Sequence, residues 1–238
     1  MSSNSNILLP GLDEQLSFLR KNTAIQINQA LVIGSGSEKI AKQLSRIYSC
    51  EVDLIVENYE SLLNSKIILG ETEKIKPFLM NFEITDFDSS HFDLIYAQGS
   101  VSLTNRNKII KEIKRILKPG GLLCVGEIVS LKKEIPSFIK NIFDSSNLLP
   151  LFVDDLEKYY AARKFKVVSQ QNLSETFREY YLQSAALLKG IENALTDQEK
   201  SYYKKLLNKV SHESNVYLKL GGNKHIGFIS LLLEKEAV

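Results

Sequence analysis

The chain has 238 residues, of which 44% are apolar, and this length and composition fit one main domain with a substantial buried core. Its 30 basic and 28 acidic residues leave a net charge of +2 with no block of either sign, which argues against a nucleic-acid partner. No stretch has the pattern of a signal peptide or a membrane span, so we expect a cytoplasmic protein with no membrane partner. The two cysteines, Cys50 and Cys124, lack metal-ligand spacing, which favours buried thiols and no metal site.

Residues 1–29 are expected to form an N-terminal helical segment. From residue 30, short β-branched runs alternate with helical stretches, a pattern typical of a parallel sheet with crossover helices. Five strands are predicted, over residues 30–34, 51–57, 77–83, 92–97 and 121–129. Isoleucines at helical spacing precede Pro119, Gly120 and Gly121, which predicts a helix that ends before the fifth strand.

The pattern becomes irregular after residue 130. Helices are expected over 136–147 and 154–163, and strands over 164–170 and 225–236. Residues 171–224 contain two expected helices and form a connection too long to be a plain loop. We therefore predict a Rossmann-like, doubly wound α/β fold with a mostly parallel, seven-stranded sheet. Its parts are a cofactor-binding core (30–170), a helical cap insertion (171–224) and the final strand of the core (225–238).

The turn after the first strand carries Gly34 and Gly36, which allow a ligand to approach the backbone closely. Glu57 ends the second strand, where a carboxylate can accept both hydroxyls of a ribose. An ordinary turn would also explain the two glycines, and a solvated carboxylate at a strand end would also explain Glu57. Together they favour a nucleotide-like ligand, either a dinucleotide or S-adenosylmethionine.

Two residues decide between these ligands. Lys39 occupies the position of the third glycine in the dinucleotide pattern, and Glu38 stands at the start of the helix. A carboxylate there would compete with a pyrophosphate for the positive helix end, whereas S-adenosylmethionine has no phosphate and is cationic. Ser35 and Glu38 also have the spacing of a capping box at a helix start.

These segments resemble the class I S-adenosylmethionine-dependent methyltransferases, in particular the small-molecule group that includes the ubiquinone/menaquinone C-methyltransferase type. "ALVIGSGSE" is similar to the first motif of that family, "LIVEN" to the second, and "IIKEIKRILKPGGLLCVGE" to the helix and turn after the fourth strand. The resemblance implies S-adenosyl-L-methionine as the cofactor, held by Gly34, Ser35, Gly36, Glu57, Asn58, Asn81, Phe82, Gln98 and Gly99.

The resemblance implies methyl transfer to a small molecule by in-line displacement, which often needs no strong base. No catalytic residue is assigned. In the cap, Arg178, Tyr180 and Tyr181 are candidates for substrate binding, although core packing is the more ordinary role for such aromatics. We expect a monomer or a homodimer.

The family's acidic residue in the first strand is Val32 here, and its third glycine is Glu38. These departures keep open a second hypothesis, a catalytically weak or inactive methyltransferase-like domain that serves as a binding or interaction module. A third, an NAD-dependent oxidoreductase, is disfavoured by Lys39 and by the Leu-Lys-Pro-Gly-Gly turn.

Overall fold

The computed structural model describes residues 8–191 and 197–237. Its centre is an eight-stranded sheet in the order β3-β2-β1-β4-β5-β8-β7, with the two-residue β6 beside β5. All pairs are parallel except those of β8, which runs antiparallel to β5 and β7. The strands are β1 (Gln29–Ile33), β2 (Glu51–Val56), β3 (Ile75–Leu79), β4 (Phe92–Gln98), β5 (Leu117–Ser130), β6 (Leu151–Phe152), β7 (Phe165–Asn172) and β8 (Ile226–Lys235).

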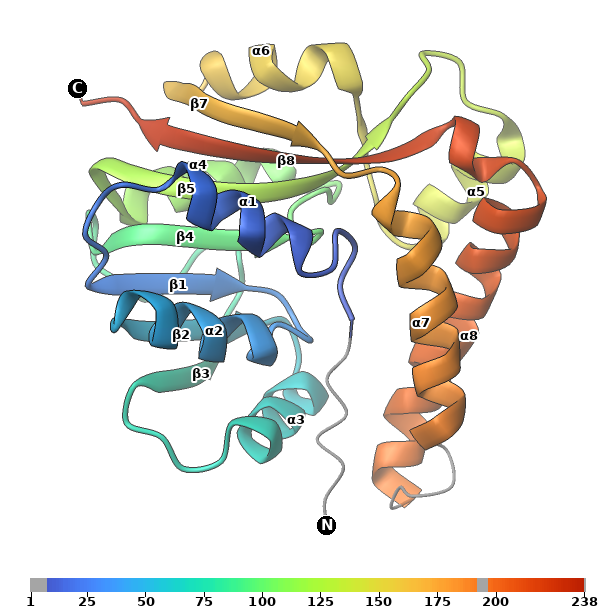
Figure 1. Cartoon of the computed structure of the whole chain (residues 1–238), viewed down its shortest axis with the longest axis horizontal. Coiled ribbons are helices and arrows are strands. Elements are labelled where there is room, and N and C mark those ends of the chain that lie inside the picture. The colour runs from blue at the N-terminus through green and yellow to red at the C-terminus, as the bar shows by residue number, and fades with distance from the viewer. Residues whose placement is uncertain (1–7, 192–196, 238) are drawn as a thin grey trace.

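Helices cover both faces of this sheet (Figure 1). They are α1 (Glu14–Asn22), α2 (Glu38–Tyr48), α3 (Tyr59–Leu69), α4 (Arg106–Ile116), α5 (Ser137–Ser145), α6 (Leu156–Ala161), α7 (Thr176–Ile191) and α8 (Asp197–Lys219). Side chains of α1 and α2 pack on one face, and those of α4 and α6 on the other. The Rossmann-like fold predicted from the sequence is confirmed, with the two-residue β6 as an eighth strand beyond the seven predicted.

The isoleucine stripe of α4 shows why this sequence forms a crossover helix. Ile109, Ile110, Ile113 and Ile116 recur at helical spacing, and each is at most 1% exposed. The lysine and arginine in its last turn complement the negative end of the helix. The buried stripe holds the helix against β4 and β5, and thereby fixes where the loop after β4 begins.

The connection between β7 and β8 forms the two long helices α7 and α8, which lie side by side across the strand ends of β1 and β2 (Figure 1). Together with α5 they build a separate apolar cluster around Phe177, Phe143 and Phe228. The domain boundaries proposed from the sequence stay a prediction. Residues 1–7, 192–196 and 238 of those ranges lie outside the described residues.

Two strand bounds predicted from the sequence were wrong. The third strand begins at Ile75 and ends at Leu79, so Asn81 and Phe82 lie in the turn that follows it. The fifth begins at Leu117, because the chain enters the strand before the Pro-Gly-Gly turn, with a register irregularity opposite Phe92. Both errors concern where a strand begins or ends next to a turn. Residue types alone do not fix such a boundary.

Both cysteines are free and buried, as predicted, and burial raises the pKa of Cys124 to about 12. Within residues 8–191 and 197–237, no group of three or more His, Cys, Asp or Glu side chains could hold a metal ion. In the same part of the chain, no helix combines the length and apolar character needed to cross a bilayer.

Candidate cofactor and substrate site

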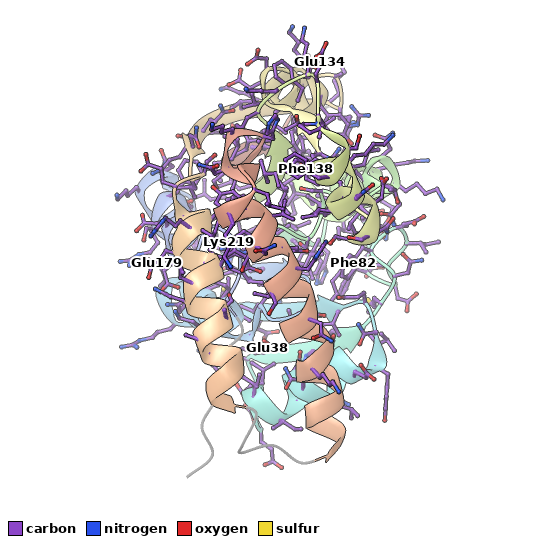
Figure 2. All side chains as sticks on the ribbon, turned by 90° about the vertical axis from the view of Figure 1, so that its right-hand side faces the viewer. Glu38, Phe82, Glu134, Phe138, Glu179 and Lys219 are labelled. Atoms are coloured by element: carbon purple, nitrogen blue, oxygen red, sulfur yellow. The ribbon has the colours of Figure 1, made fainter. Side chains whose placement is uncertain are left out.

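A cavity of about 740 Å³ opens at the carboxyl ends of β1, β2 and β4. This is the edge at which open α/β sheets bind their ligands. One part of its lining comes from the strand ends, namely Gly34, Ser35, Glu57, Asn81, Phe82, Gln98 and Gly99. Another part comes from the helices that face them, namely Ile142, Phe143, Phe177, Tyr180, Tyr181, Ser184, Leu187, Val210 and Glu213. Figure 2 looks onto α7 and α8 from outside the cavity, with the sheet behind them.

The turn after β1 requires glycine at its first position. Gly34 has φ +115°, and a Cβ added there would lie 2.7 Å from the Cβ of Ser100. The Ser100 hydroxyl donates to the Ile33 carbonyl at 2.7 Å, which holds Ser100 against the turn. The Gly34 amide is bonded to the Ile55 carbonyl at 2.9 Å. The backbone at Gly34 therefore carries no side chain and has a fixed conformation, so a ligand can approach it closely.

Ser35 joins this turn to the end of β2. Its hydroxyl donates to Oε2 of Glu57 at 2.7 Å, and both residues line the cavity. The other carboxylate oxygen and the remaining lone pairs can still accept hydrogen bonds. The structure thus brings together the glycine turn and the acidic residue that the sequence predicted to share one ligand.

The predicted capping box was wrong. Helix α2 begins at Glu38 with Ser37 at its N-cap, and Ser37 makes no side-chain capping bond. The Ser35 hydroxyl is taken by Glu57, while Oε1 of Glu38 accepts from the Ser65 hydroxyl of α3 at 2.6 Å. Glu38 is only 1% exposed, and its bond to Ser65 connects the start of α2 to α3.

Burial raises the pKa of Glu38, and hydrogen bonds from Ser65 and from the Glu38 and Gly36 amides oppose this rise. The Glu38 carboxylate is not among the groups that line the cavity. A phosphate-bearing ligand at the turn would still meet the negative charge of Glu57.

We expect Glu38→Gln to change how stability depends on pH. Because burial raises the pKa of Glu38 in the folded state, the folded protein binds the proton more tightly than the unfolded chain. Wild-type stability therefore falls as pH rises from the ordinary carboxyl pKa through the raised one. The variant lacks this loss, so its stability relative to wild type should increase as the pH rises above the ordinary carboxyl pKa of about 4. Urea denaturation at several pH values measures the difference, with the exposed Glu14→Gln as control; parallel pH profiles would contradict the prediction.

Val32 occupies the place of the family's acidic residue and is fully buried in the core. Its neighbours across the sheet are Leu54 and Tyr96. Both of these residues are also fully buried, so a carboxylate at position 32 would lie among apolar groups. The polar group that usually orients the cofactor's amino end is absent from this position.

Gln98 lines the cavity, but its side chain is occupied by protein partners. Its Nε2 donates to the carbonyls of Pro10 and Leu12 at 2.7 and 2.8 Å, and its Oε1 accepts from the Tyr96 hydroxyl. Leu9 and Pro10 line the cavity as a result of this anchoring. The sequence indicated Gln98 as a cofactor neighbour, and the structure adds its role in holding the N-terminal segment.

Of three other predicted residues, Asn81 and Phe82 line the cavity and Asn58 does not. Asn58 is not among the residues that line the cavity; its Oδ1 accepts from the Ser61 amide at 2.9 Å and so caps α3. Asn81 does line the cavity, and its Oδ1 accepts from the Glu83 amide at 2.8 Å. Phe82 lies beside it with only 8% exposure.

The cap contributes two of the three predicted substrate residues. Tyr180 and Tyr181 line the cavity, and burial raises the pKa of both hydroxyls. Arg178 is exposed and does not line the cavity. An arginine contact to a substrate is therefore not provided by this position.

Sequence reasoning missed a buried network beside the substrate part of the cavity. Glu127 of β5 accepts from the Tyr160 hydroxyl at 2.6 Å and from the Ser102 hydroxyl, and its Oε1 lies 3.2 Å from Nε of Arg106. The Ser102 hydroxyl also accepts from the amide of Ile128, which lines the cavity. The only sequence signal was an acidic residue inside an apolar strand, which does not identify its partners.

Residues 31–125 match the model of a methyltransferase domain family. The ubiquinone/menaquinone biosynthesis C-methyltransferase UbiE of Pseudoalteromonas translucida is 36% identical over 110 residues, which are 44% of this chain and 43% of that protein. The chain thus spans less than half the length of this curated relative.

Two solved structures share the fold over nearly the whole chain. A phosphoethanolamine N-methyltransferase of Haemonchus contortus in complex with S-adenosyl-L-methionine has a TM-score of 0.73 at 14% identity, over 98% of this chain and 54% of that one. The cyclase SpnF has a TM-score of 0.72 at 17% identity, over 95% and 81%. Residues 31–125 thus match a methyltransferase domain family, in a chain that shares the fold of these two solved structures.

Proposed function

We propose that this chain transfers a methyl group from S-adenosyl-L-methionine to a small molecule. The observation that carries the proposal is the bond between Ser35 and Glu57 at the cavity wall, 2.7 Å long, which fixes a carboxylate beside the bare glycine turn. A nucleoside with free ribose hydroxyls and no phosphate is the ligand that such a pair accommodates.

The proposed cofactor contacts combine residues of the cavity lining with Gly36, which is not itself among the lining residues. Glu57 would accept the ribose hydroxyls, and the backbone at Gly34, Ser35 and Gly36 would face the methionine end. Asn81 and Phe82 would lie at the adenine. Gly99 lies at the cavity beside Gln98, near the proposed entrance of the acceptor molecule.

When bound, the cofactor supplies an electrophilic methyl group on a cationic sulfonium. The acceptor atom attacks this methyl group in line, so the protein's task is to position the acceptor and exclude water. The exclusion of water is helped by an apolar part of the cavity wall, which includes Phe143, Phe177 and Leu187. No strong base is required of the chain if the acceptor atom is already nucleophilic.

Calorimetry with S-adenosylhomocysteine and with NAD tests this function. We expect micromolar or tighter binding of S-adenosylhomocysteine and none of NAD, because the turn carries Glu38 beneath it and offers no third glycine to a pyrophosphate. Absence of S-adenosylhomocysteine binding would overturn the proposal.

The alternative is a catalytically weak or inactive domain that binds ligand or partner without turnover. It is motivated by the buried Val32, and the cyclase SpnF illustrates that this fold is not confined to proteins named as methyltransferases. Binding of S-adenosylhomocysteine with no transfer of labelled methyl from S-adenosylmethionine to a panel of amines, phenols and quinols would favour it. The cytoplasmic location and the monomeric or homodimeric state stay predictions.

A further inference from the structure

The middle of α7 carries a small polar side chain in an aromatic and aliphatic part of the cavity wall. Ser184 lines the cavity and is only 5% exposed. Three other lining residues of α7 lie three or four positions away and so share its helix face, namely Tyr180, Tyr181 and Leu187. Figure 2 shows α7 in front of the sheet, with the exposed Glu179 at its outer edge. Ser184 therefore belongs to the inner side of this helix.

The Ser184 hydroxyl is unpaired. Its Oγ has no hydrogen-bond partner within residues 8–191 and 197–237. A serine inside a helix often donates to the carbonyl four residues earlier, as Ser17 of α1 does to Asp13 at 3.0 Å. Ser45 of α2, which is also buried, donates to the Cys50 carbonyl at 2.8 Å. A buried hydroxyl without such a bond lowers stability, so a ligand that pairs with Ser184 would remove this cost.

A rotation about one bond redirects this hydroxyl. Serine has three staggered rotamers about χ1, so Oγ can turn toward the cavity that the side chain lines without a movement of the α7 backbone. A hydroxyl both donates and accepts a hydrogen bond. Its partner can therefore be the oxygen of a hydroxyl or of a carbonyl group.

The surroundings of Ser184 favour an uncharged partner. An ionised group that leaves water for an aromatic and aliphatic wall is stable there only beside an opposite charge, and a serine hydroxyl supplies no charge. Glu213 also lines the cavity, but its carboxylate is bonded to the Ser146 hydroxyl at 2.8 Å and to the Tyr181 hydroxyl. These bonds connect Glu213 to its neighbours in the cap, whereas the Ser184 hydroxyl has no such role.

We propose, resting on the proposed methyltransferase function, that the acceptor molecule is an uncharged, largely apolar compound whose hydroxyl or carbonyl oxygen is held by Ser184. Its hydrocarbon body lies against the aromatic and aliphatic wall, where the burial of apolar area supplies most of the affinity. The hydrogen bond to Ser184 fixes which end of the molecule enters the cap. An uncharged accepting atom also keeps the electron pair that attacks the methyl group, and Ser184 holds the molecule without exchanging a proton with it.

Four probes with the same phenylbutyl body test this assignment: the alcohol, the fluoride, the amine and the carboxylate. Equilibrium dialysis against the full chain saturated with S-adenosylhomocysteine measures the binding of each. We expect the alcohol to bind roughly three- to ten-fold more tightly than the fluoride, which has a similar shape but forms only weak hydrogen bonds. Both charged probes should bind more weakly than the alcohol. Equal binding of alcohol and fluoride, tighter binding of either charged probe, or no binding of the alcohol would overturn the inference.

Ser184→Ala provides the second arm, with Ser45→Ala as the matched control. Both serines are buried in helices, but only Ser45 has a bonded hydroxyl. Without any probe, we expect Ser184→Ala to raise the midpoint of urea denaturation and Ser45→Ala to lower it. Ser184→Ala should also abolish the preference for the alcohol over the fluoride, which Ser45→Ala should retain. A lowered midpoint or an unchanged preference in Ser184→Ala contradicts the inference.

The two proposals fail differently. Loss of S-adenosylhomocysteine binding by the wild-type chain contradicts the methyltransferase function. Retained binding without a preference for the alcohol contradicts only the substrate class. The comparison of probes on the wild-type chain needs no variant, so it decides the question even where Ser184→Ala does not fold.

Discussion

Glu127→Ala is expected to lower the free energy of unfolding by about 3–5 kcal/mol, because it leaves the charge of Arg106 buried without its partner. Arg106 is 3% exposed and Glu127 is fully buried. The same change removes the acceptor of the Tyr160 and Ser102 hydroxyls. Urea denaturation followed by circular dichroism measures the loss.

A double variant separates the cost of the unpaired charge from the value of the pair. Arg106→Met with Glu127→Leu removes both charges and should recover most of the stability lost in Glu127→Ala. Tyr160→Phe removes one hydroxyl only and should cost about 1 kcal/mol. A loss in Glu127→Ala no greater than that in Tyr160→Phe would show that Arg106 does not depend on this carboxylate.

Glu57→Ala should weaken the binding of S-adenosylhomocysteine by about 1–3 kcal/mol, or roughly ten- to a hundred-fold, because hydrogen bonds to a charged acceptor are lost. The effect should appear as a rise in the dissociation constant measured by calorimetry, with little change in folding stability, since Glu57 is exposed at the cavity.

Glu51→Ala is the matched control for this change. Glu51 is an exposed carboxylate at the opposite end of the same strand, where it pairs with Lys76 at 3.8 Å. It should leave the affinity unaltered. Ser35→Ala should produce a smaller loss than Glu57→Ala, because it removes only the bond that orients the carboxylate. Unchanged affinity in Glu57→Ala would mean that the ribose lies elsewhere.

The core of the fold could be predicted because its signals are local. The isoleucines of α4 repeat at helical spacing, and the short apolar run before Gly34 is typical of a buried strand next to a tight turn. Parallel strands then place the residues that follow them at one edge of the sheet, which is why Gly34 and Glu57 could be paired from sequence.

The remainder depends on contacts between distant segments. The Ser35 hydroxyl had two possible partners, the Glu57 carboxylate as acceptor or a free amide of its own helix as donor, and only the packing of β2 beside β1 decides for Glu57. Glu38 likewise finds Ser65 on another helix. Which face of α7 points inward depends on its packing against α8, so Arg178 could not be excluded from periodicity alone.

The anchoring of the N-terminal segment by Gln98 has a consequence for sequence divergence and redesign. Gln98 binds carbonyl oxygens at Pro10 and Leu12, which every amino acid carries, and it does not read their side chains. The side chains of Leu8 and Leu9, by contrast, form part of the cavity wall. Substitutions at Leu8 and Leu9 can therefore leave the bonds to Gln98 intact. Ligand preference at this wall can then change in evolution, or be engineered, without a change in the fold.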